Sequence, residues 1–428
     1  MRLSSDDLPM FFGAEHARLA ERLREVAPAV AAVEAPSAQR DEATRDRAAA
    51  GVLGETGLFG LVVPRFAAHD AEDARDAASG DPHDATPGGA KRAAAPRETG
   101  RQGPLQIDVR SVCLAREMLG YVSPRADSIF AVQGLGTHAI GLAGNEQQRA
   151  GLAGHASGHA IAAFALTEPD AGSDVAAIAT MATATEGGYR LDGDKLFISN
   201  LGIADHAMVV ATVDPAKGHA GLTAFWVPLD AAGVTVRALT PIAAHPIGAL
   251  ELRGVALPAT ARIGDEGQGM RLALDTLDAF RVSVGAAAVG MARRALDEAI
   301  EFVTGRRQFG KTLAEQPLVQ AHLANMALDL DAARLLVLRA AYLRDTGAKA
   351  TTEVSIAKLG ATEAAQRVID TAVQLFGGRG VMAGAVVEQL YRAVRPLRIY
   401  EGTSEIQRTI IGRALTRGRV PAKSEGRS

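Results

Sequence analysis

The order of its hydrophobic patterns constrains the fold of this 428-residue chain most strongly. Apolar residues recur at helical spacing over roughly residues 8–65 and 107–159, and again for most of the chain after Gly269. Short runs typical of β-strands lie between these regions, separated by turn signals. The predicted strands are 160–166, 176–183, 195–198, 207–213, 222–227 and 234–239, and the predicted C-terminal helices are 270–304, 318–345, 352–376 and 404–416. Elements segregated in this way favour separate α, β and α regions over an alternating βα wind.

Residues 67–104 interrupt the first helical region. They contain no Val, Ile, Leu, Met, Phe, Tyr or Trp. Such a segment cannot bury enough apolar surface to offset the entropy of ordering it. We therefore expect a solvated or disordered insertion here.

The composition excludes several classes of function. The formal net charge of −3 offers no basic face for nucleic acid or for an anionic membrane. Cys113 is the only cysteine, so the chain has no internal disulfide framework, which fits a reducing compartment. The N-terminus lacks the apolar run of a signal peptide, and no segment approaches 18 uninterrupted apolar residues. These features predict a cytoplasmic protein. The scattered histidines predict no metal site.

One segment matches a nucleotide-binding motif but lacks the surrounding structure that the motif needs. Residues 305–312 read Gly-Arg-Arg-Gln-Phe-Gly-Lys-Thr and match the Walker A pattern letter for letter. A P-loop needs a strand before it and a helix N-terminus after it, so that backbone N–H groups can surround a phosphate. Here the preceding residues continue a long predicted helix, which disfavours an NTPase. The Gly-rich spots at 134–136 and 377–380 likewise miss the spacing of a dinucleotide-binding fingerprint.

The segment 399–408 places a carboxylate, Glu401, beside Tyr400 and a Gly-Thr turn just before a predicted helix. The glycine lets another group come close, so Glu401 is well placed to face a ligand. The same residues also suit a helix start, with Thr403 or Ser404 as the N-cap and the glutamates opposing the helix dipole. The segment alone leaves both interpretations open.

Five motifs together resemble the acyl-CoA dehydrogenase family, in the family's order. The segment Ala163-Phe164-Ala165-Leu166-Thr167-Glu168-Pro169-Asp170-Ala171-Gly172-Ser173-Asp174 resembles its first signature, and Lys195-Leu196-Phe197-Ile198-Ser199-Asn200 its flavin-facing strand. The other three are 306–310, Gln374-Leu375-Phe376-Gly377-Gly378 and Tyr400-Glu401-Gly402-Thr403. The resemblance covers nearly the whole chain apart from the insertion and the last residues.

The resemblance implies an α+β multidomain fold with an N-terminal α-helical domain over 1–159, a middle antiparallel β-barrel domain over 160–265, a C-terminal four-helix-bundle domain over 266–420 and a tail over 421–428. The strand pattern alone predicts a small antiparallel barrel or sandwich.

The resemblance also implies the chemistry. The family removes an α-proton and a β-hydride from an acyl-CoA thioester, giving a trans-2-enoyl-CoA and reduced FAD. Glu401 matches the family's base, and burial would raise its pKa towards neutrality. Some members carry the base at the position of Phe280, but phenylalanine cannot abstract a proton. The family uses no metal.

Other site residues are carried over from the resemblance. The expected FAD-binding residues are Phe164, Leu166, Thr167, Gly172, Ser173, Phe197, Ile198, Ser199, Arg306, Gln308, Phe309, Gln374, Gly377, Gly378, Thr403 and Glu405. The expected substrate-binding residues are Ser173, Asp278, Arg281 and Gly402. Phe197 replaces the family's usual tryptophan and keeps an aromatic face for the flavin. Without the resemblance, Asp278 and Arg281 would be an ordinary (i, i+3) helical ion pair.

The expected partners are an acyl-CoA, an electron-transferring flavoprotein as acceptor, and further copies of the chain, since the family's FAD site is shared between subunits of a dimer or tetramer. The insertion, the unusual 243–248 segment and Arg379 depart from the family pattern. These departures suggest a divergent subfamily, with carrier-protein-bound acyl groups as an alternative substrate. Two competing hypotheses are an oxidase or monooxygenase on the same fold and a non-enzymatic acyl-CoA-binding protein.

Overall fold

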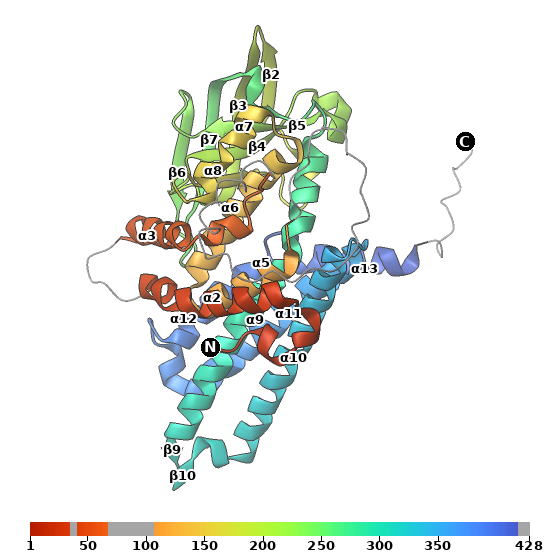
Figure 1. The fold of residues 1–428 in the computed structure, drawn as a ribbon. Coiled ribbons are helices and arrows are strands. Elements are labelled where there is room, and N and C mark those ends of the chain that lie inside the picture. The colour runs from red at the N-terminus through yellow and green to blue at the C-terminus, as the bar shows by residue number, and fades with distance from the viewer. Residues whose placement is uncertain (35–40, 67–106, 418–428) are drawn as a thin grey trace, which may run out of the picture.

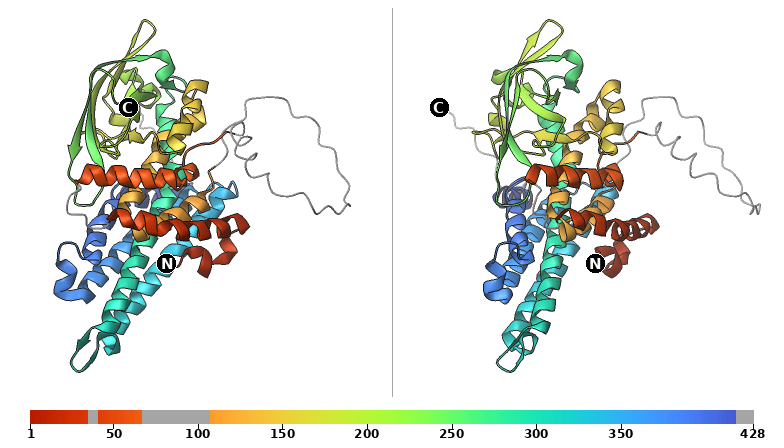
Figure 2. Two further views of the ribbon diagram at one scale, coloured as in Figure 1. Left: turned by 60° about the vertical axis from the view of Figure 1, so that its left-hand side comes forward. Right: turned by 90° about the vertical axis from the view of Figure 1, so that its left-hand side faces the viewer.

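A computed structural model describes residues 1–34, 41–66 and 107–417 (Figure 1). The predicted insertion and the predicted tail lie outside the described residues. The three regions follow one another as the sequence pattern predicts, with helices, then strands, then helices. In two further views the sheet lies at one end, the C-terminal helices lie at the other, and N-terminal helices cross between them (Figure 2).

The N-terminal region is helical. Its helices are α1 (Ser4–Asp7), α2 (Ala14–Ala31), α3 (Glu42–Glu55), α5 (Val109–Val122), α6 (Pro124–Ala143), α7 (Glu146–Ala150) and α8 (Leu152–Ala156). Short polar side chains fix where the longer ones begin. The side chains of Asp108 and Ser123 accept hydrogen bonds from the backbone N–H of the third residue on, at the starts of α5 and α6. Pro124 then occupies the first position of α6, where no N–H is needed.

The middle region is one mixed sheet. Its strands are β1 (Ala162–Ala165), β2 (Met181–Thr185), β3 (Gly188–Ser199), β4 (His206–Thr212), β5 (Leu222–Pro228), β6 (Val234–Leu239), β7 (Ile247–Pro258) and β8 (Arg262–Ile263). They run in the order β6-β7-β3-β2-β4-β5-β8, and β1 pairs with β4.

Two features of the predicted barrel are wrong. Over 160–265 the strand path ends at β6 and β8 and does not close. In addition, β1 and β2 each run parallel to β4, so the sheet is not wholly antiparallel. The parallel pairs arise because the chain crosses between non-neighbouring strands, which residue patterns within single strands do not reveal. Strand β7 was not among the predicted strands, because register shifts against β3 break its alternation.

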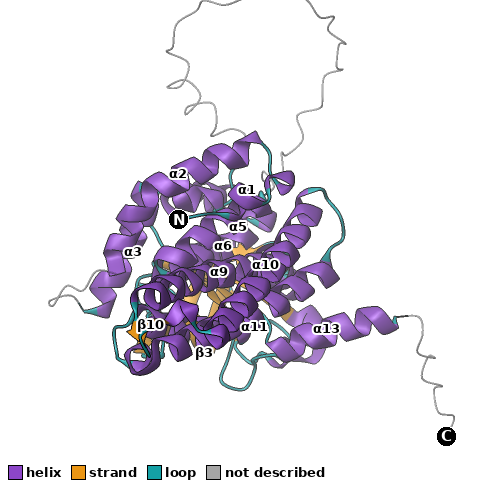
Figure 3. Cartoon of the chain, turned by 90° about the horizontal axis from the view of Figure 1, so that it is seen from below, coloured by secondary structure: helices purple, strands orange, loops and turns teal. Residues whose placement is uncertain are grey.

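The C-terminal region is a bundle of long helices. They are α9 (Gly269–Gly305), α10 (Pro317–Asp345), α11 (Thr351–Phe376), α12 (Val386–Val394) and α13 (Ser404–Thr416). Helices α9 to α12 share one buried apolar core with α5. Seen along the bundle, α13 projects away from its body (Figure 3).

Small residues bring α5 and α9 close together. A Cβ at Gly120 would lie 2.4 Å from the carbonyl oxygen of Ala287, and one at Gly290 would lie 2.1 Å from that of Glu117. A larger residue at either position would push the two backbones apart. Since α5 belongs to the N-terminal region, this crossing ties the two helical regions together.

A buried ion pair joins the strands that carry two of the predicted motifs. The Nζ of Lys195 on β3 donates to Glu168 Oε1 at 2.8 Å and to the carbonyl oxygen of Val210 at 2.6 Å. Glu168 also accepts from the backbone N–H groups of Ala179 and Thr180. Burial lowers the pKa of Lys195 to about 8 although Glu168 opposes the change. The pair therefore fixes the segment after β1 against β3.

None of the helices within the described residues is both long and apolar enough to cross a bilayer.

We predict that Lys195→Met lowers the unfolding free energy of the middle region by about 3 kcal/mol, because it leaves the Glu168 charge buried without its cation. Chemical denaturation monitored by the fluorescence of Trp226, the chain's only tryptophan and a residue of β5, measures this change. Lys217→Met makes the same change at an exposed lysine of this region and should leave the transition where it is. An unchanged transition in Lys195→Met would contradict the role given to the pair.

Candidate functional site

Glu401 lies in a strained turn between the bundle and α13. Its φ of 52° lies in the left-handed region, which residues other than glycine rarely adopt. Gly402 follows with a φ of 90°. A Cβ at Gly402 would lie 2.6 Å from the side-chain nitrogen of Gln407, so only glycine fits there. Thr403 then caps α13, accepting a 3.3 Å hydrogen bond from the backbone N–H of Ile406. The helix-start interpretation therefore holds for Thr403 and leaves the Glu401 side chain outside the cap.

Three side chains hold this turn by its carbonyl oxygens. The Nε of Arg281 on α9 donates to the Glu401 carbonyl at 3.1 Å, and the Nζ of Lys358 on α11 donates to the Gly402 carbonyl at 2.8 Å. The Nε2 of Gln407 donates to both, at 3.3 and 3.0 Å. Donors from α9, α11 and α13 thus fix a backbone that would otherwise relax.

Glu401 is half-buried, and its Oε2 is shielded from solvent. Within the described residues this oxygen has no hydrogen-bond partner. Burial raises the pKa of Glu401, while Arg116, Arg281 and Lys358 oppose the increase. Lys358 is itself fully buried, and burial lowers its pKa to about 8. A shielded, unpaired carboxylate oxygen with a raised pKa is the arrangement that a general base requires.

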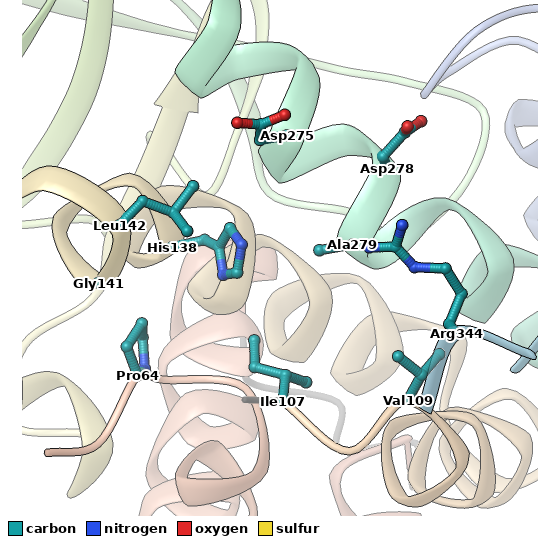
Figure 4. Close-up of a pocket in the computed structure, with 10 residues that line it drawn as sticks. All are labelled: Pro64, Ile107, Val109, His138, Gly141, Leu142, Asp275, Asp278, Ala279 and Arg344. Atoms are coloured by element: carbon teal, nitrogen blue, oxygen red, sulfur yellow. The ribbon is translucent and has the colours of Figure 1, made fainter. Parts of the chain in front are cut away.

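Asp278 and Arg281 form the ion pair that their spacing predicts, and Arg281 also reaches the Glu401 turn. Asp278 lines a cavity of ≈ 340 Å³ together with Asp275, His138 and Arg344 (Figure 4). The remaining lining is largely apolar and includes Pro64 and Ile107, the residues near the two ends of the described chain at the insertion. Glu401 is not among the lining residues, so this cavity does not by itself define the place of the chemistry.

The first group of predicted flavin contacts comes together at the edge of the sheet. Phe164 lies on β1, Leu166 and Thr167 follow it, and the backbone N–H of Leu196 donates to the Thr167 carbonyl at 3.0 Å. Ile198 is buried. Phe197, by contrast, is 62% exposed and has a φ of 58°. Gly172 and Ser173 lie exposed in the loop before β2.

Ser199 at the end of β3 has a partner that the sequence did not indicate. Its hydroxyl lies 2.7 Å from Nε2 of His245, and the Nδ1 of the same ring contacts the Ser128 hydroxyl. Burial lowers the pKa of His245 to about 4, so the ring is neutral near pH 7. His245 belongs to the segment that departs from the family pattern.

A second group lies at the far end of the bundle from the sheet (Figure 1). Arg306, Gln308 and Phe309 occupy the end of α9 and the hairpin of β9 (Arg307–Gln308) and β10 (Lys311–Thr312). Gln374, Gly377 and Gly378 lie at the end of α11, next to them, because Phe376 stacks on Phe302 of α9 at 4.2 Å. The Walker-like segment thus spans a helix end and a hairpin, which is not the context of a P-loop.

The structure therefore divides the predicted site residues into three groups: the sheet edge, the far end of the bundle, and the Glu401 turn with Asp278, Arg281, Gly402, Thr403 and Glu405. Glu405 is exposed in the first turn of α13. Four residues other than glycine have a positive φ in the described chain, namely Phe197, Asn200, Phe309 and Glu401. Three of these are predicted site residues, one in each group. Strained backbone of this kind concentrates at functional sites.

The residues present fit a flavin nucleotide. Phe197 and Phe309, the latter 92% exposed, offer ring faces to a planar ligand. A Cβ at Gly172, Gly377 or Gly378 would meet no atom within 4 Å, so both groups leave open space. Arg306, in the group at the far end of the bundle, is exposed, and its guanidinium suits a diphosphate. The described residues contain no group of three or more His, Cys, Asp or Glu side chains that could hold a metal.

Sequence reasoning missed Lys358, Gln407, His245, Arg116 and Asp127, the last of which forms a buried ion pair with Arg116. Lys358 interrupts a buried, alanine-rich face of α11, where burying a charge costs free energy unless the charge is paired or hydrogen-bonded. A lysine within such a face is a signal that could have been used. The other four depend on contacts between distant parts of the chain.

Comparison with known proteins shows the family of the chain. The model described as "Acyl-CoA dehydrogenase, C-terminal domain" matches residues 267–416, and the one described as "Acyl-CoA dehydrogenase, middle domain" matches residues 163–255. The probable acyl-CoA dehydrogenase FadE25 of Mycobacterium tuberculosis is 38% identical over 75% of this chain and 83% of its own length. The short-chain specific acyl-CoA dehydrogenase of Megasphaera elsdenii is 38% identical over 72% of this chain and 82% of its own.

Solved structures resemble the whole described fold. The structure of butyryl-CoA dehydrogenase from Megasphaera elsdenii matches with a TM-score of 0.80 and 29% identity, covering 95% of this chain and 99% of that one. The helix, strand and helix order, the two domain matches and relatives spanning three quarters of the chain lead to one conclusion: the chain belongs to the acyl-CoA dehydrogenase family.

Proposed function

We propose that this protein is an FAD-dependent dehydrogenase that converts an acyl-CoA thioester to the trans-2-enoyl-CoA, with Glu401 as the base that removes the α-proton. One observation carries the proposal: Oε2 of Glu401 is buried and has no hydrogen-bond partner within the described residues, on a strained turn fixed from three helices. The family membership supports the reaction class and FAD as the cofactor.

The side chains around the turn and the turn's own backbone have different roles. Arg281, Lys358 and Gln407 occupy the carbonyl oxygens, so the turn cannot relax and Glu401 keeps its direction. The backbone N–H of Glu401 has no acceptor within the described residues. It is therefore available to the thioester carbonyl of the substrate, where it would stabilise the negative charge that develops as the α-proton leaves.

The proton moves from the α-carbon to a Glu401 carboxylate oxygen. The carboxylate must be ionised to accept it, yet its basicity must approach that of a weakly acidic carbon. Burial supplies the basicity, and Arg116, Arg281 and Lys358 keep the charged form accessible. When bound, FAD supplies at N5 the acceptor for the hydride that leaves the β-carbon. Phe164, Phe197 and Ser199 would hold its ring system, and Asp278 would contact the substrate.

We infer that two copies of the chain build each FAD site. The sheet-edge group lies where the sheet meets α6, since Ser199 and Ser128 share His245, whereas the far-end group lies at the hairpin end of the bundle (Figure 1). One FAD needs both ring and pyrophosphate contacts. Large apolar side chains are exposed along the bundle, among them Leu318, Leu328 and Leu415. A second copy would cover these side chains and bring its Arg306, Gln308 and Gln374 to the first copy's ring site.

An electron-transferring flavoprotein is the proposed acceptor of the electrons. One solved structure that resembles this chain, with a TM-score of 0.80 and 29% identity, is reported in work on the electron transferring flavoprotein of Acidaminococcus fermentans. If reduced enzyme reacts rapidly with oxygen instead, the chain is an oxidase on the same fold. Acyl groups on a carrier protein remain the alternative substrates, and a panel of acyl-CoA and acyl-carrier thioesters distinguishes the two.

We predict that Glu401→Gln keeps FAD but loses its reduction by substrate. The amide matches the carboxylate in shape and cannot accept the α-proton, so the rate of anaerobic flavin bleaching should fall by about 10²–10⁴-fold. Stopped-flow absorbance with a panel of acyl-CoA thioesters measures the rate. Glu186→Gln, at an exposed carboxylate between β2 and β3, is the control and should bleach at the normal rate. Normal bleaching in Glu401→Gln would rule out the assigned base.

We predict that Glu401 makes stability depend on pH. Because the folded pKa of Glu401 lies above its ordinary value of 4.5, the folded protein binds the proton more tightly than the unfolded chain. The group therefore destabilises the fold progressively as pH rises from 4.5 through the folded pKa. Glu401→Gln should melt at a higher temperature than wild type at pH 7 to 8, and the difference should shrink towards pH 4.5. Thermal melts across this range test the sign, and a difference that grows on acidification would contradict it.

We predict that Lys358→Met weakens the turn without removing the base. The Gly402 carbonyl would keep Gln407 but lose its charged donor, so flavin bleaching should slow by about tenfold, equivalent to 1.4 kcal/mol. The FAD content should stay at the wild-type level, which absorbance at the flavin band checks. Lys349→Met, at an exposed lysine before α11, is the matched control. Unchanged bleaching in Lys358→Met would show that Arg281 and Gln407 hold the turn alone.

A further inference from the structure

His245, in the segment that departs from the family pattern, lies between two serine hydroxyl groups. Its Nε2 is 2.7 Å from the Ser199 hydroxyl at the end of β3, and its Nδ1 contacts the Ser128 hydroxyl on α6. Both ring nitrogens are therefore engaged, and a chain of three side chains runs from α6 to the sheet edge. The backbone beside the ring is fixed as well, because the N–H of Asn200 donates to the carbonyl of Pro246 at 2.8 Å.

The Ser199 end of this chain lies among the predicted ring contacts. Phe197 and Asn200, which flank Ser199, have φ values of 58° and 66°, and the Phe197 ring is 62% exposed. Strained backbone on both sides of one residue is a mark of a functional position. Ser199 itself is half-buried. In the proposed function Ser199 lies next to the flavin ring, whereas His245 and Ser199 separate Ser128 from it.

The ring of His245 couples the two hydroxyl groups. Burial lowers the pKa of His245 to about 4, and the Arg125 guanidinium lowers it further, so the ring is neutral near pH 7. A neutral imidazole has one N–H group and one bare nitrogen. With the proton on Nε2, the ring donates to Ser199, whose own proton is free for a neighbour. With the proton on Nδ1, Nε2 accepts from Ser199, which then offers its neighbour only a lone pair.

A flavin requires both of these states in turn. Its ring nitrogen N5 is a bare acceptor when oxidised and carries a hydrogen when reduced. We propose that His245 is a positioning residue that lets the Ser199 hydroxyl donate to N5 of the oxidised flavin and accept from N5 of the reduced flavin. One proton leaves Nε2 and one arrives at Nδ1 between the two states, so the ring gains no charge, and Ser128 changes from donor to acceptor. The inference rests on the proposed function for the place of the flavin, but not on which substrate reduces it.

Removing the imidazole should lower the reduction potential of the bound flavin. In His245→Phe, which keeps a planar ring without nitrogen, Ser199 can still donate to the oxidised flavin. When Ser199 accepts from the reduced flavin, its own O–H group is left without an acceptor, and an unpaired donor beneath a bound ring costs more than an unused lone pair. The ratio of reduced to oxidised flavin at a given potential should fall by about tenfold, equivalent to about 30 mV for a two-electron couple. Anaerobic spectral titration of the FAD-loaded enzyme against a dye of known potential measures the shift.

Variants at Ser128 test the far end of the chain and do not depend on the folding of His245→Phe. Ser128→Ala leaves Nδ1 without a partner, and a bare nitrogen tolerates this better than an N–H group does. The proton should therefore stay on Nε2, Ser199 should remain a donor, and the potential should fall as in His245→Phe. Ser128→Thr keeps the hydroxyl group and should keep the wild-type potential.

A double-mutant cycle shows whether the effect passes through Ser199. In Ser199→Ala the chain no longer reaches the flavin, so adding Ser128→Ala should leave the potential of that variant unchanged. Thermal melts of the same proteins separate this role from a purely structural one. If the variants melt at lower temperature while their potentials equal that of wild type, His245 only ties β3 to α6 and the inference is wrong.

The same samples distinguish this inference from the proposed reaction. If the potentials shift as stated but no acyl thioester bleaches the wild-type flavin, the proposed reaction is wrong and the role of His245 stands. If acyl thioesters bleach the flavin and the potentials of wild type, His245→Phe and Ser128→Ala coincide, the reaction stands and the role of His245 is refuted. A wild-type protein that binds no FAD would overturn both.

Discussion

The left-handed turn at Glu401 and Gly402 is the constraint on which the site depends. A glutamate in this conformation costs of order 1–3 kcal/mol, and it persists only where surrounding contacts fix it. Here Arg281, Lys358 and Gln407 fix it through carbonyl oxygens, so the cations do not neutralise the carboxylate by direct pairing. The turn is thereby rigid while the acid group stays free to react. A salt bridge to the carboxylate itself would give rigidity at the expense of basicity.

Strain of the same kind marks the other two groups of predicted site residues. Phe197 at the sheet edge and Phe309 on the hairpin have positive φ values and exposed rings, which is an unfavourable combination for residues without a ligand or partner. Phe197 lies where the sheet meets α6, and Phe309 lies in the hairpin of β9 and β10 at the far end of the bundle. A dimeric or tetrameric assembly resolves both facts, because one copy's hairpin can then lie against another copy's sheet edge. The exposed apolar stretch of α10 and α13 agrees with such an assembly.

Local sequence patterns predicted the helices, but they did not predict the strand connections or the contacts around Glu401. Helices α9, α10, α11 and α13 begin and end within a residue of their predicted limits, because hydrophobic periodicity is a local signal, whereas α12 was not predicted. The prediction of a closed antiparallel barrel was wrong, because the crossovers between β1, β2 and β4 depend on the path of the chain and not on patterns within single strands. The position of Glu401 followed from a motif, but its unpaired oxygen did not. The surroundings of that oxygen are set by Arg116, Lys358 and Gln407. No local sequence pattern reveals that these side chains lie near the Glu401 turn. The roles of the individual site residues remain predictions.

The charges around the turn also suggest why so many buried ions are gathered at one place. With Lys358 protonated, the charged groups that act on Glu401 are three cations (Arg116, Arg281 and Lys358) and one carboxylate (Asp127), so these groups and Glu401 together carry one net positive charge before reaction. Transfer of a proton to Glu401 removes one negative charge and raises the net positive charge to two. The substrate becomes negative in the same step, at the carbonyl next to the carbon that lost the proton. The cluster thus becomes more attractive to the substrate as the transition state is approached, and interactions that strengthen at that stage are the ones that raise the rate.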